Sequence, residues 1–549
     1  MPPIYLDCNA TTPLCPAARA AMLDAMGCCG NASSAHLDGQ RAAAQIANAR
    51  QQVATLLGID DARDLVFTSG ATEANNLVLD GIAEAARRDG RVKPAFVIGA
   101  IEHSSLLAPS RKLAKMGVIE LREVPVGRDG IVRVEDVASR IDPATVLVSI
   151  QGANNEIGTI QPIEAIGDLC AARGVLFHTD LCQSLGKVQF DASKFDLASM
   201  SAHKLYGPTG VGALYGRGPV FAWLEPQTLG GGQENGRRAG TLNLHGIPGF
   251  GAAADAMRRA WCEGTEGMRL RYLRDALLEA LRASLADVRV NGAIDPPCWT
   301  AGYAVRGLRL PHNLNVTLLG ADGKMFHALV RNRVSLSAGS ACKALGGQRS
   351  HVLDAIGAPT DGAVMRVGLG ANVSERDVAE AAKAIVEAAR AAGARPKTVG
   401  RGLDANTTVT PSGEADTTIT HGVRILGAPI GSTVTVGAWP APAVPGMATP
   451  TFLIPSGVQG PQDVRIVTPV GEVRQWRGDV PIAGEFTLRF DEMATLTPPP
   501  APPAAPRRFA LPASQLGQSL PAKVVTPPIR LDGVPAGAQV LVNGVPCRR

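Results

Sequence analysis

Short apolar runs alternate with alanine-rich segments along the first 395 residues of the chain. The apolar runs are rich in β-branched and aromatic residues, which predicts strands over 64–67, 95–98, 145–148, 175–177 and 196–198. Helical spacing predicts helices over 73–88 and over 163–173, where Gly174 is placed to end the second helix. This alternation is typical of an α/β fold with a largely parallel sheet.

Two further helices, over 268–284 and 375–392, predict a smaller domain that follows the first. Beyond about residue 400 the helical pattern ends, and 22 of the 40 prolines lie in the last 149 residues. The composition of this last part therefore indicates a different module.

Val- and Thr-rich runs in the C-terminal part predict strands over 433–436, 463–467 and 485–490. The stretch 497–503 predicts a stiff proline-rich linker, and 538–542 followed by Asn543-Gly544 predicts a hairpin. We therefore expect a large domain over 1–255, a small domain over 256–397, a β module over 398–495, and a linker with a short terminal β segment over 496–549.

Composition excludes several classes of protein. Apolar residues make up 45% of the 549 residues and charged residues 19%, which is ordinary for a globular protein and argues against global disorder. The net charge of +5 is spread along the chain and supports no nucleic-acid interaction. The first residues lack the charged and apolar regions of a signal peptide, and no apolar run approaches the length of a spanning helix, so we expect a cytoplasmic protein without membrane contact. Ten cysteines without zinc-ligand spacing predict mostly reduced thiols and no metal site.

Lys204 stands in a polar loop directly after the strand predicted over 196–198. Partial burial in such a loop lowers the pKa of a lysine and leaves a nucleophilic amine, which can form a Schiff base with an aldehyde cofactor. A lysine after a strand is more often a surface charge, so its position alone leaves both roles open.

Asp180 and the turn Ser69-Gly70-Ala71-Thr72 also follow predicted strands. A carboxylate at the carboxyl end of a parallel strand can pair with the pyridinium nitrogen of pyridoxal 5'-phosphate (PLP), although it can equally cap a helix. The turn opens a helix, so its backbone N–H groups and the Thr72 hydroxyl can hold a phosphate. Similar turns also open helices that bind nothing.

Seven motifs occur in a characteristic order and spacing between about residues 4 and 392. They are Tyr5 to Pro13, Ser69 to Asn76, Glu102 to Ser105, Asn154 to Thr159, Ser201 to Lys204, Arg238 to Thr241, and Gly339 to Cys342. Together they resemble the PLP-dependent cysteine desulfurases of the NifS/IscS type, which are similar to class V aminotransferases. The resemblance implies the PLP-dependent transferase fold type I, with a mixed, mostly parallel sheet in the large domain and a small α/β domain.

The resemblance also implies a role for individual residues. Lys204 is expected to bind PLP covalently, Asp180 to pair with the pyridine nitrogen, and Gln183 to contact the phenolic oxygen. His103 is expected to stack on the ring and to carry a proton. The expected phosphate ligands are Ala71, Thr72, Ser201 and His203, with Thr241 reaching the phosphate bound to the other subunit of a homodimer. Asn155 and Arg366 match positions that hold the substrate carboxylate, for which the arginine fork is suited.

The desulfurase hypothesis depends on Cys342 as the nucleophile. This cysteine lies in a loop of small residues where the family places its nucleophile. The resemblance implies that its thiolate attacks the sulfur of L-cysteine, so that alanine and a persulfide on Cys342 are formed. Lys343 beside it could favour the thiolate. Cys182 is interpreted as a packing residue, and a relay through Cys547 as a remote alternative.

Several questions of function stay open at this point. The sulfur acceptor is expected to be a protein that serves Fe–S clusters, tRNA thiolation or DNA sulfur modification, and the C-terminal module could bind a partner of its own. A related PLP-dependent lyase, such as a selenocysteine lyase, or an aminotransferase is the alternative enzyme. The alternative outside enzymes is a scaffold whose β tail is the working part.

Overall fold

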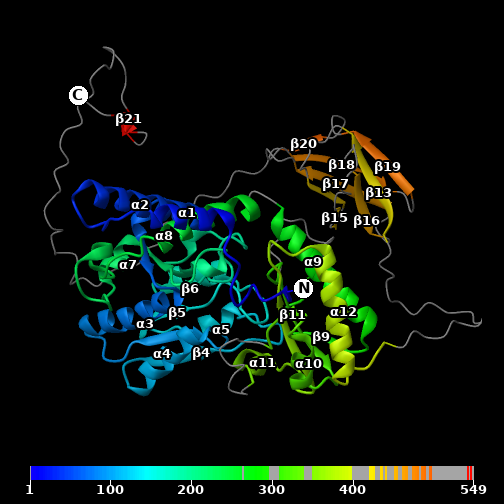
Figure 1. Ribbon diagram of the computed structural model, residues 1–549, viewed down its shortest axis with the longest axis horizontal. Helices are drawn as coiled ribbons and strands as arrows, with labels where there is room; N and C mark the ends of the chain where they lie inside the picture. The colour runs from blue at the N-terminus through cyan, green and yellow to red at the C-terminus, as the bar shows by residue number, and fades with distance from the viewer. Residues whose placement is uncertain are drawn as a thin grey trace, which may run out of the picture. The chain divides into compact units, whose positions relative to one another are not determined.

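The computed structural model describes residues 2–262, 265–295, 308–338 and 349–397, and beyond these only strands between residues 419 and 546 (Figure 1). The chain divides into two compact units, Met1–Phe509 and Ala510–Arg549. No helix within the described ranges is long and apolar enough to cross a membrane.

A seven-stranded sheet forms the centre of the N-terminal part, with the strand order β2-β8-β7-β6-β5-β3-β4. Its strands are β2 (Leu65–Thr68), β3 (Ala95–Gly99), β4 (Glu120–Val124), β5 (Thr145–Ser149), β6 (Leu176–Asp180), β7 (Leu197–Ser201) and β8 (Gly212–Gly216). Only β8 runs antiparallel to its neighbours, and the remaining adjacent pairs are parallel. The mixed, mostly parallel sheet is the one that the sequence predicts.

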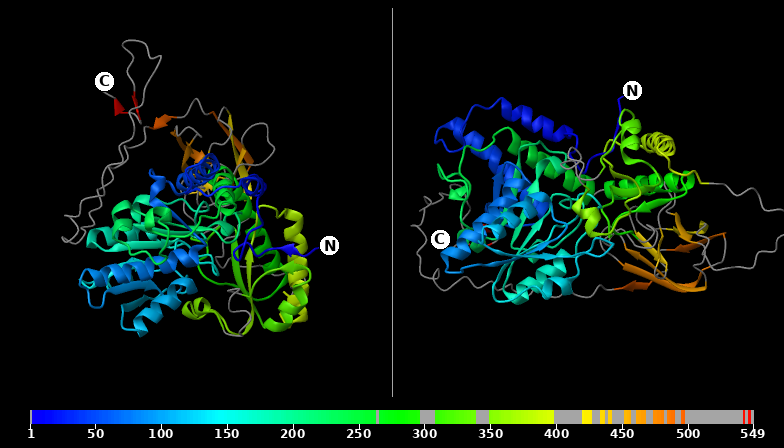
Figure 2. Two further views of the ribbon diagram at one scale, coloured as in Figure 1. Left: turned by 60° about the vertical axis from the view of Figure 1, so that its left-hand side comes forward. Right: turned by 90° about the horizontal axis from the view of Figure 1, so that it is seen from below.

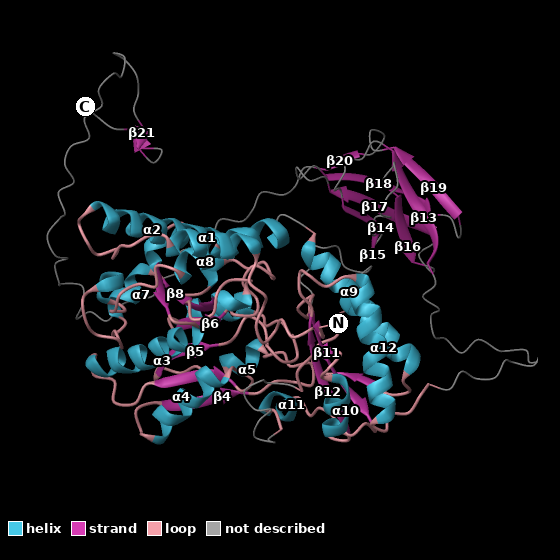
Figure 3. Cartoon of the chain, viewed as in Figure 1, coloured by secondary structure: helices cyan, strands magenta, loops and turns pink. Residues whose placement is uncertain are grey.

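Helices lie on both sides of this sheet (Figure 3). They are α1 (Pro16–Met26), α2 (Leu37–Leu57), α3 (Ala71–Arg88), α4 (Ser104–Lys115), α5 (Val134–Ala138), α6 (Ile163–Arg173), α7 (Gly218–Trp223) and α8 (Gly246–Met257). Helix α6 ends at Gly174, whose left-handed backbone (φ 65°) suits a residue without a Cβ atom. The predicted helices over 73–88 and 163–173 are thereby confirmed to within two residues.

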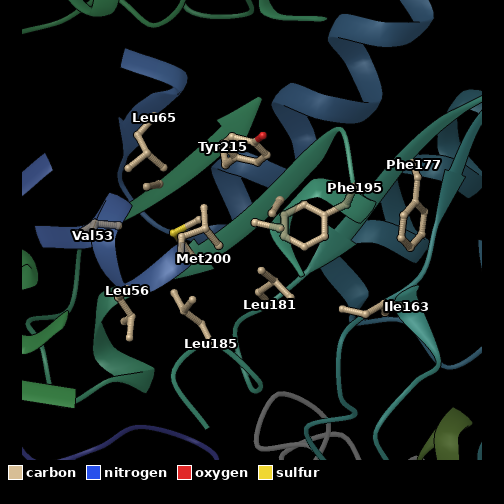
Figure 4. Close-up of a cluster of buried hydrophobic side chains, with 14 of the residues drawn as sticks. Val53, Leu56, Leu65, Ile163, Phe177, Leu181, Leu185, Phe195, Met200 and Tyr215 are labelled. Carbon is tan, nitrogen blue, oxygen red and sulfur yellow. The ribbon is translucent and has the colours of Figure 1, made fainter. Parts of the chain in front are cut away.

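The core of the large domain lies between α2, α6, α8 and one face of the sheet. Alternate strand residues point into it because successive side chains of a strand face opposite sides. Figure 4 shows part of this cluster, in which Phe177, Phe195 and Met200 are fully buried. The buried face holds the strands in register, and so it sets the positions of the loops that follow them.

The small domain contains the antiparallel sheet β12-β10-β9. Its strands are β9 (Val288–Val290), β10 (Asn313–Leu319) and β12 (Gly362–Gly368), and its helices are α9 (Glu266–Ser284), α10 (Gly323–Val330), α11 (His351–Ala355) and α12 (Glu375–Ala391). Helices α9 and α12 lie side by side and share one core with this sheet (Figure 2). The N-terminal strand β1 (Ile4–Tyr5) pairs with β11 (Val334–Ser335), which ties the start of the chain to this domain.

The described residues of the C-terminal part form two more sheets and one hairpin. The sheets have the orders β16-β13-β19 and β15-β14-β17-β18-β20, and the hairpin pairs β21 with β22. Their strands are β13 (Ile419–Leu426), β14 (Thr433–Val436), β15 (Trp439–Ala441), β16 (Thr451–Pro455), β17 (Gly460–Val467), β18 (Val473–Val480), β19 (Gly484–Arg489), β20 (Ala494–Leu496), β21 (Leu541–Val542) and β22 (Val545–Pro546). The strands predicted over 433–436, 463–467 and 485–490 are present, and so is the hairpin around Asn543-Gly544. The linker 497–503 and Cys547 lie outside the described residues.

Candidate active site

The carboxyl ends of β2, β3, β5, β6 and β7 lie at one edge of the central sheet. These strands run in the same direction because β8, which lies between β2 and β7, is antiparallel to both. Ligand-binding groups gather at such an edge in open α/β sheets. Nine of the twelve predicted site residues lie at the ends of these five strands or in the segments that follow them.

A cavity of about 390 Å³ opens at this edge. It brings together ten residues that the sequence singles out: Ala71, Thr72, His103, Asn155, Asp180, Gln183, Ser201, His203, Lys204 and Arg366. Of these residues, Arg366 comes from β12, and Asn9 and Ala10 of the N-terminal segment line the cavity as well. Both the large and the small domain therefore contribute to the site.

Lys204 follows β7 and is largely desolvated. Its Nζ donates hydrogen bonds of 2.6 Å to the carbonyl oxygens of Asn9 and Ala10. Burial lowers the pKa of Lys204 to about 8, with Arg366 contributing in the same direction. At neutral pH a larger fraction of this amine is therefore uncharged and nucleophilic than in a lysine with the ordinary pKa.

The lowered pKa of Lys204 predicts how the apoprotein takes up PLP. Only the neutral amine attacks an aldehyde, and its fraction rises as the pH increases through about 8, rather than through the ordinary value of 10.5. We expect the rate of covalent PLP uptake to rise over this range and to level off above it. Stopped-flow absorbance of the apoprotein mixed with PLP measures the rate, and a rate that still climbs steeply above about pH 9.5 would contradict the prediction.

Asp180 lies at the end of β6 and is 7% exposed. Its Oδ2 accepts a hydrogen bond of 2.9 Å from Asn75 Nδ2, and its Oδ1 accepts one of 2.9 Å from the backbone N–H of Cys182. These two N–H donors hold the buried carboxylate in one orientation. The position of Asp180 fits its predicted role of pairing with a ring nitrogen.

Gln183 and Asn9 hold each other on the wall of the cavity. Asn9 Nδ2 donates to Gln183 Oε1, and Gln183 Nε2 donates to the carbonyl oxygen of Asn9, both at 3.1 Å. Asn313 Nδ2 donates to Asn9 Oδ1, which connects the pair to β10. The orientation of Gln183 therefore depends on segments that are far apart in the sequence.

One side of the cavity is formed by the predicted phosphate ligands, which are the first turn of α3 together with Ser201 and His203. The first N–H groups of a helix have no partner within the helix, so they can bind an anion. Burial lowers the pKa of His203 to about 4, so its ring is neutral, and its Nδ1 lies 3.1 Å from Thr11 Oγ1. A desolvated lysine, a buried carboxylate and this group of donors fit the aldehyde, ring nitrogen and phosphate of PLP.

Arg366 in β12 is held by Asp7, a neighbour for which the sequence alone predicts no role. Asp7 Oδ1 accepts from Arg366 Nη2 at 2.8 Å, and Asp7 Oδ2 accepts from Ser337 Oγ at 2.7 Å. The carbonyl oxygen of Asn155 accepts from Arg366 Nη1 at 3.2 Å, whereas the buried Arg366 Nε has no partner among the described residues. A guanidinium that is oriented on two sides and free at Nε suits a carboxylate ligand.

Asp7 is expected to stabilise the fold as well as the site. Asp7→Ala leaves the Arg366 guanidinium, which is 1% exposed, without its ion-pair partner. We expect a loss of about 3 kcal/mol in the free energy of unfolding, measured by urea denaturation of the holoprotein. Asp7→Asn serves as the matched variant, because the amide still accepts from Arg366 and should lose markedly less. Equal stability of Asp7→Ala and the wild type would show that the ion pair contributes nothing.

Two predicted site residues remain, Thr241 and Cys342. Thr241 is exposed and does not line the cavity of its own chain, so its predicted reach to a second subunit stays a prediction. Cys342 lies in the segment 339–348, outside the described residues. Cys182 lines the cavity, and burial raises the pKa of its thiol, so it is a poor nucleophile.

Sequence reasoning left several supporting residues without a role. Asp7, Asn9 and Asn75 belong to motifs that carry the resemblance, and Gln151 follows β5. Membership of a motif was the one signal that pointed to the first three. Their hydrogen-bond partners, however, are set by tertiary packing.

The Aminotransferase class-V family matches residues 4–380. The chain is 39% identical over 394 residues to the cysteine desulfurase IscS of Stutzerimonas stutzeri strain A1501, an alignment that covers 70% of this chain and 92% of that protein. Among solved structures, a NifS-like protein has a TM-score of 0.61 and 31% identity, with coverage of 70% of this chain and 99% of the other. The structure of SspA in complex with cysteine has a TM-score of 0.56 and 30% identity, with coverage of 67% and 98%. With this sequence match over most of the chain, and with the desolvated lysine and buried aspartate in one cavity, the chain belongs to the class-V aminotransferases, a PLP-dependent family, and within them to the cysteine desulfurases of the IscS and NifS type.

Proposed function

We propose that the cavity at the edge of the central sheet is the active site of a cysteine desulfurase that converts L-cysteine to L-alanine and passes the sulfur to Cys342. The observation that carries the proposal is the convergence of Lys204, Asp180 and Arg366 on one cavity. Family membership supports the reaction, and the similarity to SspA, whose structure is known in complex with cysteine, supports the substrate.

PLP, when bound, supplies the electron sink that stabilises negative charge at the substrate Cα. Lys204 would hold the cofactor covalently at rest, and its released Nζ would take the Cα proton. Asp180 would pair with the ring nitrogen, and Gln183 with the phenolic oxygen. Thr72, Ala71, Ser201 and His203 would bind the phosphate.

The substrate carboxylate would bind Arg366, with Asn155 beside it. Arg366 Nε is buried and unpartnered among the described residues, and a carboxylate oxygen would satisfy it. This contact would orient the Cα–H bond of the substrate toward Lys204. His103, which lines the same cavity, is the second side chain there with a nitrogen that can form a hydrogen bond to the reacting groups.

In the sulfur-transfer step, Cys342 Sγ would form a bond to the substrate sulfur while the Cβ–S bond of the substrate breaks. The products are L-alanine and a persulfide on Cys342, so no oxidant is needed. Holoenzyme incubated with L-cysteine and a thiol reductant, which releases the persulfide sulfur as sulfide, should form alanine in equal amount to the sum of persulfide and sulfide. Alanine without a matching amount of persulfide and sulfide, or persistent failure to form alanine, would reject the proposal.

The proposed enzyme is a cytoplasmic homodimer in which Thr241 contacts the phosphate in the other subunit. Within its own chain the neighbouring Arg238 is paired with Glu73, which brings this loop near the phosphate-binding turn. The sulfur acceptor is proposed to be a protein that serves Fe–S cluster, tRNA-thiolation or DNA sulfur chemistry. Residues 398–495 are proposed to be a binding or tethering module.

The shared phosphate site can be tested by mixing two inactive or weakened chains. Thr241→Ala should weaken PLP binding by about 1.5–3 kcal/mol, because one hydrogen bond to a charged acceptor is lost. In a heterodimer with Lys204→Ala, the intact Lys204 belongs to the Thr241→Ala chain, and its phosphate would be contacted by the unmutated Thr241 of the partner. One site of wild-type PLP affinity per heterodimer is expected; weakened binding at every competent site would refute the shared arrangement.

A further inference from the structure

A chain of side-chain hydrogen bonds connects Asp180 with His103 behind the wall of the cavity. Asn75 Nδ2 donates to Asp180 Oδ2 and to Ser105 Oγ, both at 2.9 Å. Ser105 Oγ lies 2.8 Å from His103 Nδ1. Asn75 is 0% exposed and Ser105 is 7% exposed, so water competes little with these bonds.

The direction of each bond in this chain is determined by its two ends. The Asn75 side chain turns its NH₂ group toward the Asp180 carboxylate, because Nδ2 is the atom that lies within hydrogen-bond distance of Asp180 Oδ2. Both N–H bonds of that group are then used, and Ser105 Oγ accepts the second. The opposite orientation would place the Asn75 carbonyl oxygen against the carboxylate.

The other end is determined by the start of α4. The backbone N–H of Ser105 donates to His103 Nδ1 at 3.2 Å, which makes His103 the N-cap of the helix. Nδ1 must therefore be an acceptor and carry no proton. The Ser105 hydroxyl, which already accepts from Asn75, can give its own proton to the same nitrogen, so Nδ1 has two donors.

We propose that Asn75 and Ser105 are positioning residues that keep His103 as the neutral tautomer with its proton on Nε2. This inference rests on the proposed function and deepens it. A ring nitrogen that already carries a proton cannot accept one, so Nε2 of His103 can act only as a hydrogen-bond donor in the cavity that this residue lines. Lys204 is then the group that takes the Cα proton.

The charges around His103 are compatible with a neutral ring. Burial lowers the pKa of His103, Lys204 acts in the same direction, and Asp180 opposes them. Asp180 lies at the far end of the hydrogen-bond chain and accepts from Asn75 and from Cys182. Among the residues that the structure describes, no carboxylate is hydrogen-bonded directly to the His103 imidazole.

The tautomer can be measured by NMR of resting holoenzyme labelled with ¹⁵N-histidine. The His103 signals are assigned from their loss in His103→Gln. We expect a protonated Nε2 and an unprotonated Nδ1 near neutral pH. A proton on Nδ1 in the wild type would overturn the proposal.

Ser105→Ala tests the hydroxyl separately from the backbone N–H. Loss of one bond that favours the neutral ring should raise the pKa of His103 by up to about one pH unit, and the pH profile of turnover should move with it. Asn75→Ala should shift the same pKa in the same direction. Ser104→Ala, an exposed neighbour in the same helical turn, is the matched control and should change neither.

An unchanged His103 pKa in both Ser105→Ala and Asn75→Ala would reject the positioning role. Because the NMR signals are recorded without substrate, failure of the enzyme to turn over cysteine would count against the proposed function and leave the tautomer result standing. Loss of activity in Ser105→Ala with unchanged NMR signals would indicate a structural defect and would also contradict the inference.

Discussion

Lys204→Ala is expected to lower the turnover of L-cysteine by about 10⁴-fold or more, equivalent to ~5.4 kcal/mol in the barrier. The substitution removes the amine that binds PLP and the base that takes the Cα proton. It should also abolish covalent retention of PLP after treatment with borohydride. Alanine formation and the absorbance of the denatured, reduced protein measure the two effects.

Lys194→Ala is the matched control for this experiment. Lys194 is a surface lysine whose Nζ lies 2.8 Å from Asp168 Oδ1, away from the residues that line the cavity. It should keep full activity and full PLP retention. Covalent PLP in Lys204→Ala would show that another amine serves the cofactor, and the assignment of Lys204 would be wrong.

Cys342→Ala is expected to lower the turnover of L-cysteine by roughly 100-fold or more, about 2.7 kcal/mol in the barrier. The sulfur then has no protein thiolate to receive it, whereas the proposed cofactor and carboxylate contacts remain. Addition of L-cysteine should therefore still change the cofactor absorbance, although alanine and persulfide no longer accumulate. This separation of binding from turnover distinguishes a desulfurase nucleophile from a cysteine that packs in the fold.

Cys29→Ala provides the comparison for Cys342→Ala, because Cys29 is an exposed free cysteine outside the cavity. Its activity should equal that of the wild type. Full alanine production by Cys342→Ala would remove the central claim and favour a lyase that needs no persulfide, such as a selenocysteine lyase. Loss of PLP from this variant would instead assign Cys342 a structural role.

The sequence determined much of the fold because the burial pattern of each element is local. The apolar runs of β5 and β6 and the alanine-rich faces of α3 and α12 repeat with the periods of strands and helices, so their existence and type were predictable. Gly174 marked the end of α6 for an equally local reason. Helix α3 begins at Ala71, two residues before the predicted start, because the N-cap residue Gly70 has no side chain that could mark the boundary.

The chemistry of the candidate site was also largely readable, since Lys204, Asp180 and Thr72 stand where strands end and their motifs resemble a known family. What the sequence by itself could not show is how these residues are supported. Asp7 is hydrogen-bonded to Arg366, which lies 359 residues further along the chain. Asn75 of α3 is hydrogen-bonded to Asp180 of β6 and to Ser105 of α4. Hydrogen-bond geometry depends on distances of a few tenths of an ångström, which are set only when the sheet and the small domain pack together. The sequence therefore indicated which groups are proposed to do the chemistry, and the tertiary structure decided their orientation, their desolvation and the hydrogen bonds around His103.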